Sequence, residues 1–225
     1  MKMAAKDPYR SHIRGDAEKT TYWRHGEPPC YDNSAFEEGR SKVWPSGSLE
    51  EIVQNLVKTW EMEMSHKCHV EDVKTVDHQL FTLAVNGRTS KSVDEVVRTG
   101  TYNILLQSEA PCAYYDSSKE NFESSHHTFH HAFNNKFPWE VLQVYSGPPV
   151  VVFKWRHWGR MKGEFRGHAA TGELVEIIGV AVATVNSELK LTSVEVYFDQ
   201  EQFLKKLCKG KKSSLENVNA NASLK

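Results

Sequence analysis

Four histidines stand close together in residues 122–133, which read FESSHHTFHHAF. Imidazole has an ordinary pKa close to neutral pH, so this segment is the clearest candidate for proton transfer in the chain. At about 100° per residue on a helix, His126 falls on the face that carries the phenylalanines. His130 lies at the border of that face, whereas His127 and His131 point toward solvent.

Two kinds of chemistry fit this segment. Packing against aromatic rings would tune the protonation of His126, which makes it a candidate acid–base residue; a core histidine bonded to a backbone carbonyl fits equally well. A metal site needs ligands one helical turn apart, and His126 with His130, or His127 with His131, meets that spacing near Glu123. Because no third ligand is evident, we predict no bound metal. No sequence motif predicts a cofactor.

The segment 150–158 alternates in a way that is typical of a strand with two different faces. Its mostly apolar face carries Phe153, Trp155 and His157, and its other face is basic. We expect the apolar face to form a pocket wall, although plain core packing fits the same pattern.

Polar residues on two further strands could act together with the histidines. Glu176 shares a face with isoleucine and valine, so it lies either at the rim of the sheet or in a setting that raises its pKa. On the last strand, Tyr197 and Asp199 share one face. If that face points inward, Tyr197 is a hydrogen-bond donor and Asp199 a candidate base; if it points outward, both are surface residues.

A long helix is predicted to begin at Ser48, which fits a capping box with Glu51. Apolar residues follow at helical spacing up to Met64, and Trp60 on that face is either core or pocket wall. His66 lies at the helix end, where the dipole favours a charged imidazole. The residues expected to line the pocket are Trp60, His66, Phe129, His130, Phe133, Phe153, Trp155, His157 and Glu176.

The elements that position these residues change character along the chain. Residues 1–46 are rich in turns yet dense in aromatic residues, so we expect an ordered extension packed on the domain. Residues 47–208 form the domain, in which Ser124 or Ser125 is expected to cap the second long helix, and residues 209–225 read as a flexible tail. Strands are expected within 70–86 and at 139–145, 150–158, 174–185 and 189–198, and residues 93–107 read as helix or mixed structure. Helices followed by consecutive antiparallel strands indicate an α+β fold with a curved sheet wrapped around helices.

Long stretches of the chain resemble the plant pathogen-related protein family: WRHG at 23–26, WPSGSLEEIVQNLVKTWEMEMSHK at 44–67, FESSHHTFHHAF at 122–133 and WEVLQVYSGPPVVVFKWRHWG at 139–159. The last third also resembles the SnoaL-like polyketide cyclases, through GHAATG at 167–172 and EVYFDQ at 195–200. The resemblance implies a cone-shaped nuclear transport factor 2-like barrel, often paired as a homodimer through its sheet. It also implies an acid–base role for Asp199. This chain departs from the plant family at His127, where members often have aspartate.

Charge and composition exclude several classes of function. The formal net charge of −1 gives no reason to expect a nucleic-acid partner. The four cysteines are widely spaced, which argues against a zinc site or a disulfide framework. Neither a signal peptide nor an apolar run of membrane-spanning length is evident, so we expect a cytoplasmic chain without membrane insertion.

These observations lead to one preferred function and one alternative. We expect the barrel pocket to bind a small lipophilic plant metabolite (a terpenoid, polyketide or phenolic) in specialised metabolism or defence. Cofactor-free isomerase, cyclase or dehydratase activity stays open, with His126, Tyr197 and Asp199 as the catalytic candidates. The alternative is a non-catalytic accessory or scaffold protein that assists biosynthetic enzymes such as membrane-bound oxygenases.

Overall fold

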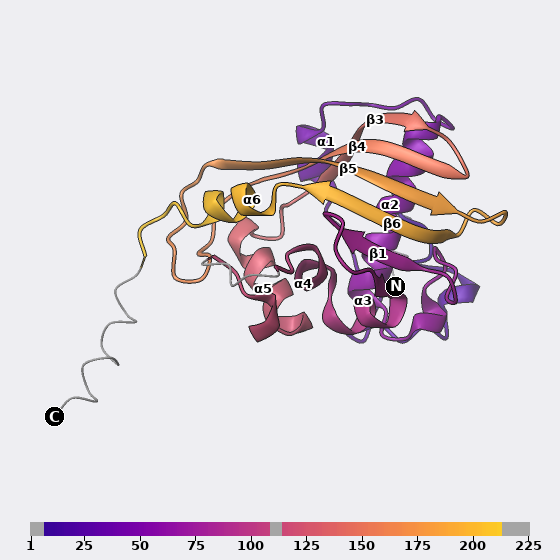
Figure 1. Cartoon of the computed structure of the whole chain (residues 1–225), viewed down its shortest axis with the longest axis horizontal. Helices are drawn as coiled ribbons and strands as arrows, with labels where there is room; N and C mark the ends of the chain where they lie inside the picture. Colours follow the sequence, from indigo (N-terminus) through magenta and orange to yellow (C-terminus); the bar gives the residue numbers. More distant parts are fainter. Residues whose placement is uncertain (1–6, 109–113, 213–225) are drawn as a thin grey trace, which may run out of the picture.

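The computed structural model describes residues 7–108 and 114–212 and combines helices with one large sheet (Figure 1). The helices are α1 (Ser34–Gly39), α2 (Leu49–His66), α3 (Val93–Thr99), α4 (Thr101–Leu105), α5 (Phe122–Phe133) and α6 (Gln200–Leu207). The strands are β1 (Thr82–Val85), β2 (Lys91–Ser92), β3 (Trp139–Ser146), β4 (Val150–Arg160), β5 (Leu174–Val185) and β6 (Leu191–Phe198).

The six strands form one sheet in the order β2-β1-β6-β5-β4-β3. β1 and β6 are parallel, and the other neighbours are antiparallel. The predicted α+β fold with a curved sheet and packed helices is therefore confirmed. The sheet is open, because β2 and β3 stand at its two ends and do not pair with each other.

The two long helices have the predicted extents, but their caps differ from the prediction. Ser48 accepts a hydrogen bond from the Glu51 amide, whereas the Glu51 carboxylate binds the Gly47 amide instead of completing a capping box. Asn121, and neither Ser124 nor Ser125, caps α5: its side chain accepts from the Ser124 amide. A side-chain oxygen at this position satisfies an amide that has no partner within the helix.

The region between these helices has less strand than expected. Within residues 70–86 only β1 is a strand, and 70–72 form a turn of 3-10 helix. Residues 93–107 are helical, divided into α3 and α4 at Gly100. Gly100 has φ 88°, a conformation that favours glycine, and a Cβ there would lie 3.1 Å from the His126 ring.

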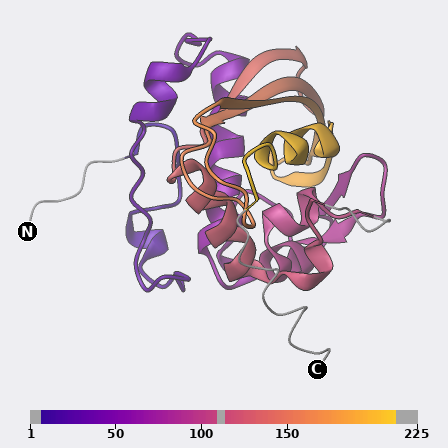
Figure 2. The same ribbon diagram turned by 90° about the vertical axis from the view of Figure 1, so that its left-hand side faces the viewer.

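The N-terminal extension runs along α2, and Figure 2 shows its indigo ribbon on one side of the molecule. Glu18 of this extension forms a buried ion pair with Lys67, with 2.9 Å between Oε2 and Nζ. Lys67 also binds Glu63 at 2.9 Å and donates to the Asp72 carbonyl at 2.8 Å. At the other end of the extension, Ser41 donates two hydrogen bonds to the buried Glu140 carboxylate.

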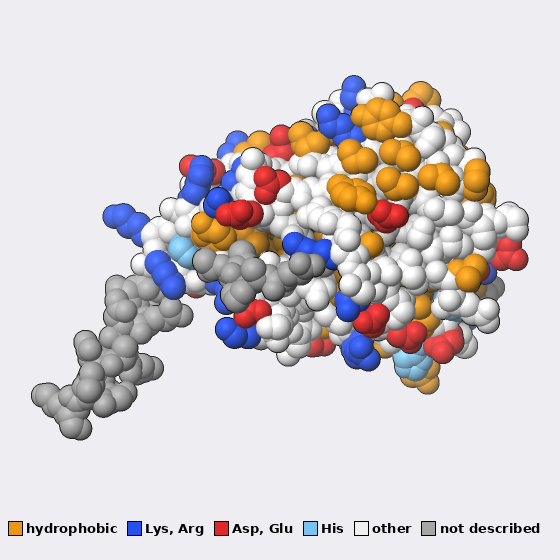
Figure 3. Space-filling model, in the orientation of Figure 1, with side chains coloured by type: hydrophobic (Ala, Val, Ile, Leu, Met, Phe, Trp, Pro, Cys, Tyr) orange, Lys and Arg blue, Asp and Glu red, His pale blue; other side chains and the backbone are white. Residues whose placement is uncertain are grey.

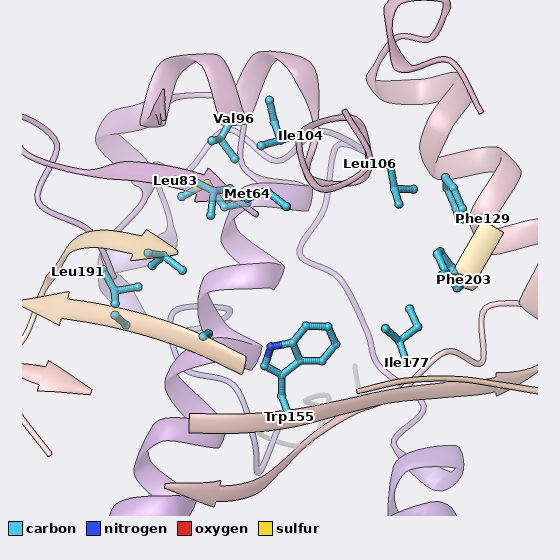
Figure 4. Packing of buried hydrophobic residues seen from close by; sticks show 14 of the residues in the cluster. Met64, Leu83, Val96, Ile104, Leu106, Phe129, Trp155, Ile177, Leu191 and Phe203 are labelled. Atoms are coloured by element: carbon cyan, nitrogen blue, oxygen red, sulfur yellow. The ribbon is translucent and has the colours of Figure 1, made fainter. Parts of the chain in front are cut away.

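The concave face of the sheet and the helices meet in one hydrophobic cluster (Figure 4). Trp155 points from β4 toward the helices, with Leu83 on one side and Phe129 and Phe203 on the other. Gly179, the cross-strand partner of Trp155, leaves room for the indole, because a Cβ at this position would overlap the ring. This packing fixes which residues of β4 and β5 face inward.

The end of the described chain lies against an earlier loop. The Ala169 amide donates to the Lys211 carbonyl, and His168 pairs with Lys212. Residues 213–225 of the predicted tail lie outside the described residues.

Candidate functional site

His126 lies half-buried on α5 and stacks on Phe122, with 3.9 Å between ring centroids. Its Nδ1 lies 2.8 Å from the Phe122 carbonyl, which can only accept. The neutral ring therefore carries its proton on Nδ1 and a lone pair on Nε2. Nε2 is buried and has no hydrogen-bond partner among the residues that the structure describes. Burial lowers the pKa of His126 to about 4, so the ring is neutral at physiological pH.

Further rings extend from His126 into a histidine–tyrosine cluster, defined here as His25, His66, His126, His130, Tyr31 and Tyr102. Tyr102 of α4 lies 5.1 Å from His126 and 6.2 Å from His130, between ring centroids. His66, at the end of α2, lies 3.4 Å from the Tyr31 hydroxyl through Nδ1 and 5.9 Å from the His25 ring. The extension thus supplies His25 and Tyr31 to a site otherwise built by helices.

Glu61 places one carboxylate beside this cluster. Its negative charge raises the pKa of both Tyr31 and Tyr102, in each case second to burial. Burial lowers the pKa of His66 and His130, and the Glu61 charge opposes that shift. Burial of His66 thus acts against the helix dipole, which favours the charged imidazole.

Sequence reasoning found three of the four histidines but missed Glu61, Tyr31, Tyr102 and His25. Glu61 follows the apolar Val57 by one helical turn, and this spacing could have placed it beside the inner face of α2. The tyrosines and His25 come from segments brought in by tertiary contacts, for which the sequence carries no spacing signal.

The predicted pocket wall divides into a buried core and a partly exposed rim. Phe129, Phe133, Phe153 and Trp155 are buried in the hydrophobic cluster. His157 is half-buried and stacks on Phe137, with 3.7 Å between ring centroids. Its Nδ1 lies 2.9 Å from the Pro138 carbonyl, and burial lowers its pKa to about 3. Trp60 is half-buried, and its indole nitrogen is buried without a hydrogen-bond partner.

The polar residues of the last two strands do not join the cluster. Tyr197 is 41% exposed and donates to Glu195 on the outer face of β6. Asp199 is exposed and caps α6 by accepting from the Gln202 amide. Of the two orientations that the sequence leaves open, this face therefore takes the outward one, and Val194 on the opposite face of β6 is buried in the core. Glu176 pairs with Arg156 on the outer face, at the rim.

The outer face of the sheet carries an apolar surface, visible as a group of hydrophobic side chains over β3, β4 and β5 (Figure 3). We define the outer-face patch as Tyr145, Val152, Ile178, Val180, Val182 and Tyr197. Tyr145 is 56% exposed and Ile178 is 48% exposed. Val152 pairs with Val182, and Val180 pairs with Tyr197, so the patch extends from β4 across β5 to β6, and Tyr145 adds a member on β3.

Residues 7–108 and 114–212 contain neither a metal-binding cluster nor a membrane-spanning helix. No three histidine, cysteine, aspartate or glutamate side chains are placed to hold a metal ion together. No helix of the described chain combines the length and the apolar character needed to cross a membrane.

The fold and site define an α+β protein with an open curved sheet and a cluster of histidines and tyrosines beside its apolar interior. No protein-family model matches the chain. A "Pathogen-related protein" from Hordeum vulgare is 46% identical over 204 residues, which cover 88% of this chain and 87% of that protein. The chain belongs to the pathogen-related protein family.

The solved structures that match this chain are less similar to it. A protein described as a polyketide cyclase from Acidithiobacillus ferrooxidans is 14% identical over 75% of this chain and 100% of its own, with a TM-score of 0.44. A protein described as a SnoaL-like polyketide cyclase, from Jannaschia sp. CCS1, is also 14% identical over 75% of this chain and 100% of its own, with a TM-score of 0.40. Similarity at this level says nothing about activity.

Proposed function

We propose that this protein binds a small lipophilic plant metabolite, such as a terpenoid, polyketide or phenolic, between the concave face of the sheet and helices α2 and α4. One observation carries the proposal: several apolar side chains pack against the buried core yet keep part of their surface exposed. They include Leu56, Val57, Trp60, Tyr102, Leu105, Phe137, Trp139 and Phe198. Covering such surface with a ligand contributes about 25 cal/mol per Å² of apolar area removed from water.

The histidine–tyrosine cluster gives this site the groups for cofactor-free proton transfer. The lone pair on His126 Nε2 can accept a proton from a carbon beside a carbonyl group. A neighbouring tyrosine hydroxyl, such as that of Tyr102, can donate to the developing oxyanion. General acid–base catalysis of this kind contributes roughly 10²–10⁴-fold to a rate. Isomerisation, cyclisation and dehydration are the reaction classes that these groups support.

A paired substitution on α2 tests the binding proposal. Val57 is half-buried on the inner face of the helix, whereas Ile52 is 55% exposed on the outside. Val57→Trp should fill the proposed site and abolish binding of farnesol and naringenin, measured by isothermal titration calorimetry. Ile52→Trp should bind like the unmodified protein. Equal binding by both variants, or none by the unmodified protein to either probe, would count against the site.

We also propose that the outer-face patch mediates contact with a second copy of the chain. Monomers rarely expose a continuous apolar surface of this kind without a partner. Light scattering after size exclusion should give a dimer for the unmodified protein and a monomer for Val180→Glu. A monomeric unmodified protein would contradict the homodimer. The outer-face patch would then be a contact surface for a biosynthetic enzyme, as the alternative of an accessory protein requires.

A further inference from the structure

Lys58 is a buried lysine that lacks the polar partners such a residue normally has. It lies on α2 beneath the N-terminal extension, with only 4% of the residue exposed. Its Nζ lies 3.7 Å from the centroid of the Phe36 ring and 5.9 Å from that of Tyr9. Nζ makes no hydrogen bond or ion pair with any residue that the structure describes. Its neighbour Thr59 accepts from the Ser11 amide, which places this side of the helix against the extension.

The loss of hydration outweighs the contacts of Lys58, so its amine is neutral for much of the time. An ammonium group loses its hydration when it is buried, and the face of an aromatic ring compensates for only part of that loss. Lys67, which directly follows this helix, is also fully buried, but it is compensated by two carboxylates and a carbonyl. Lys58 has no such compensation, and burial lowers its pKa to about 7.

The charged groups around Lys58 do not reverse this conclusion. Arg10 disfavours a second positive charge and contributes the largest electrostatic effect on the pKa of Lys58 after burial. Glu61, Asp7 and Glu140 act in the opposite direction, each more weakly. Asp7 and Glu140 are already paired, the first with Arg10 and the second with Arg156.

We propose that Lys58 is a covalent attachment site for aldehydes and ketones, which its amine binds as an imine. The nitrogen lone pair attacks the carbonyl carbon to form a carbinolamine. The carbinolamine then loses its oxygen as water, so amine and carbonyl give imine and water with no change of oxidation state. The Phe36 and Tyr9 rings favour an apolar carbonyl compound, since they offer no hydrogen bond near Nζ.

The Tyr9 ring, the more distant of the two rings beside Lys58, is partly exposed. The Tyr9 hydroxyl donates to Glu37 at 2.8 Å, and that hydrogen bond is exposed. Exposed contacts of this kind open more readily than buried ones. The site is separate from the histidine–tyrosine cluster and stands independently of the proposed lipophilic pocket.

Site-resolved labelling tests the proposal. The full chain is treated with benzaldehyde and cyanoborohydride, which reduces an imine to a stable secondary amine, and each lysine is quantified by peptide mass spectrometry. At pH 7, Lys58 should be labelled at least ~10-fold faster than the exposed Lys42, because a larger fraction of its amine is neutral. The ratio should fall as pH rises toward 10, where Lys42 also loses its proton.

Lys58→Met supplies the control, since methionine has a similar length and suits a buried position. This variant should keep its circular dichroism spectrum and lose only the fast-labelling site. Labelling of Lys58 that is no faster than that of Lys42, or that appears only after denaturation, would overturn the proposal.

Discussion

Replacing Lys67 by methionine should destabilise the protein strongly. The change removes three polar contacts, to Glu18 and Glu63 at 2.9 Å and to the Asp72 carbonyl at 2.8 Å. It leaves two buried carboxylates without their shared cation. Breaking a buried ion pair by removing one partner costs about 3–5 kcal/mol. Because whole proteins are stable by only about 5–15 kcal/mol, we expect a loss of roughly 10 °C in Tm.

Urea unfolding, followed by circular dichroism, measures this cost directly. The matched control is Lys91→Met, which removes a partly exposed pair with Glu95 at 3.2 Å. Exposed pairs of this spacing contribute only about 0.3–0.5 kcal/mol. The double variant Lys67→Met, Glu63→Gln should recover part of the loss, since one uncompensated charge is removed. A Lys67→Met protein within ~1 kcal/mol of the unmodified one would refute the reasoning that this network anchors the extension.

Three further predictions follow from the packing and the caps. The folded-state pKa of His126 is about 4 and that of His157 about 3, both below the ordinary value of 6.5. Between these values and 6.5 the unfolded chain binds more protons than the folded chain. The free energy of unfolding, measured in a series of chemical denaturations, should therefore fall as pH drops from about 6.5 toward 4. Stability that is constant over that range would contradict neutral, buried histidines. Gly179→Ala should cost about 1–3 kcal/mol in urea unfolding, because the new Cβ meets the Trp155 ring; a neutral effect would mean that the indole moves freely. Asp199→Ala should lower the free energy of unfolding by about 1 kcal/mol, because the N-terminal cap of α6 is lost, and should leave the binding of farnesol unchanged. Loss of farnesol binding would show instead that Asp199 is part of the binding site.

Local patterns in the sequence predicted the elements well. The extent of α5 follows from its spacing of aromatic residues, and the inward face of β4 follows from strict alternation ending in His157. Alternation could not decide which face of β6 points inward, so Tyr197 was open to either placement. Packing decides it, since Val194 fills the core side.

Contacts between distant segments explain what the sequence could not predict. Lys58 lies on α2 and Lys67 directly follows it, and nothing in their spacing distinguishes a solvated lysine from a buried one. Their burial depends on an extension that begins about 50 residues earlier, with Glu18 compensating one of the two. The histidine–tyrosine cluster has the same origin, because Tyr31 and His25 reach His66 only once the extension has packed.

Native mass spectrometry of the protein purified from plant tissue tests the central claim most directly. A lipophilic molecule of a few hundred daltons should stay bound to the folded chain and be released on unfolding. The Val57→Trp variant, purified in the same way, should carry none. A folded chain that has the mass of the polypeptide alone in every preparation would contradict a metabolite-binding role.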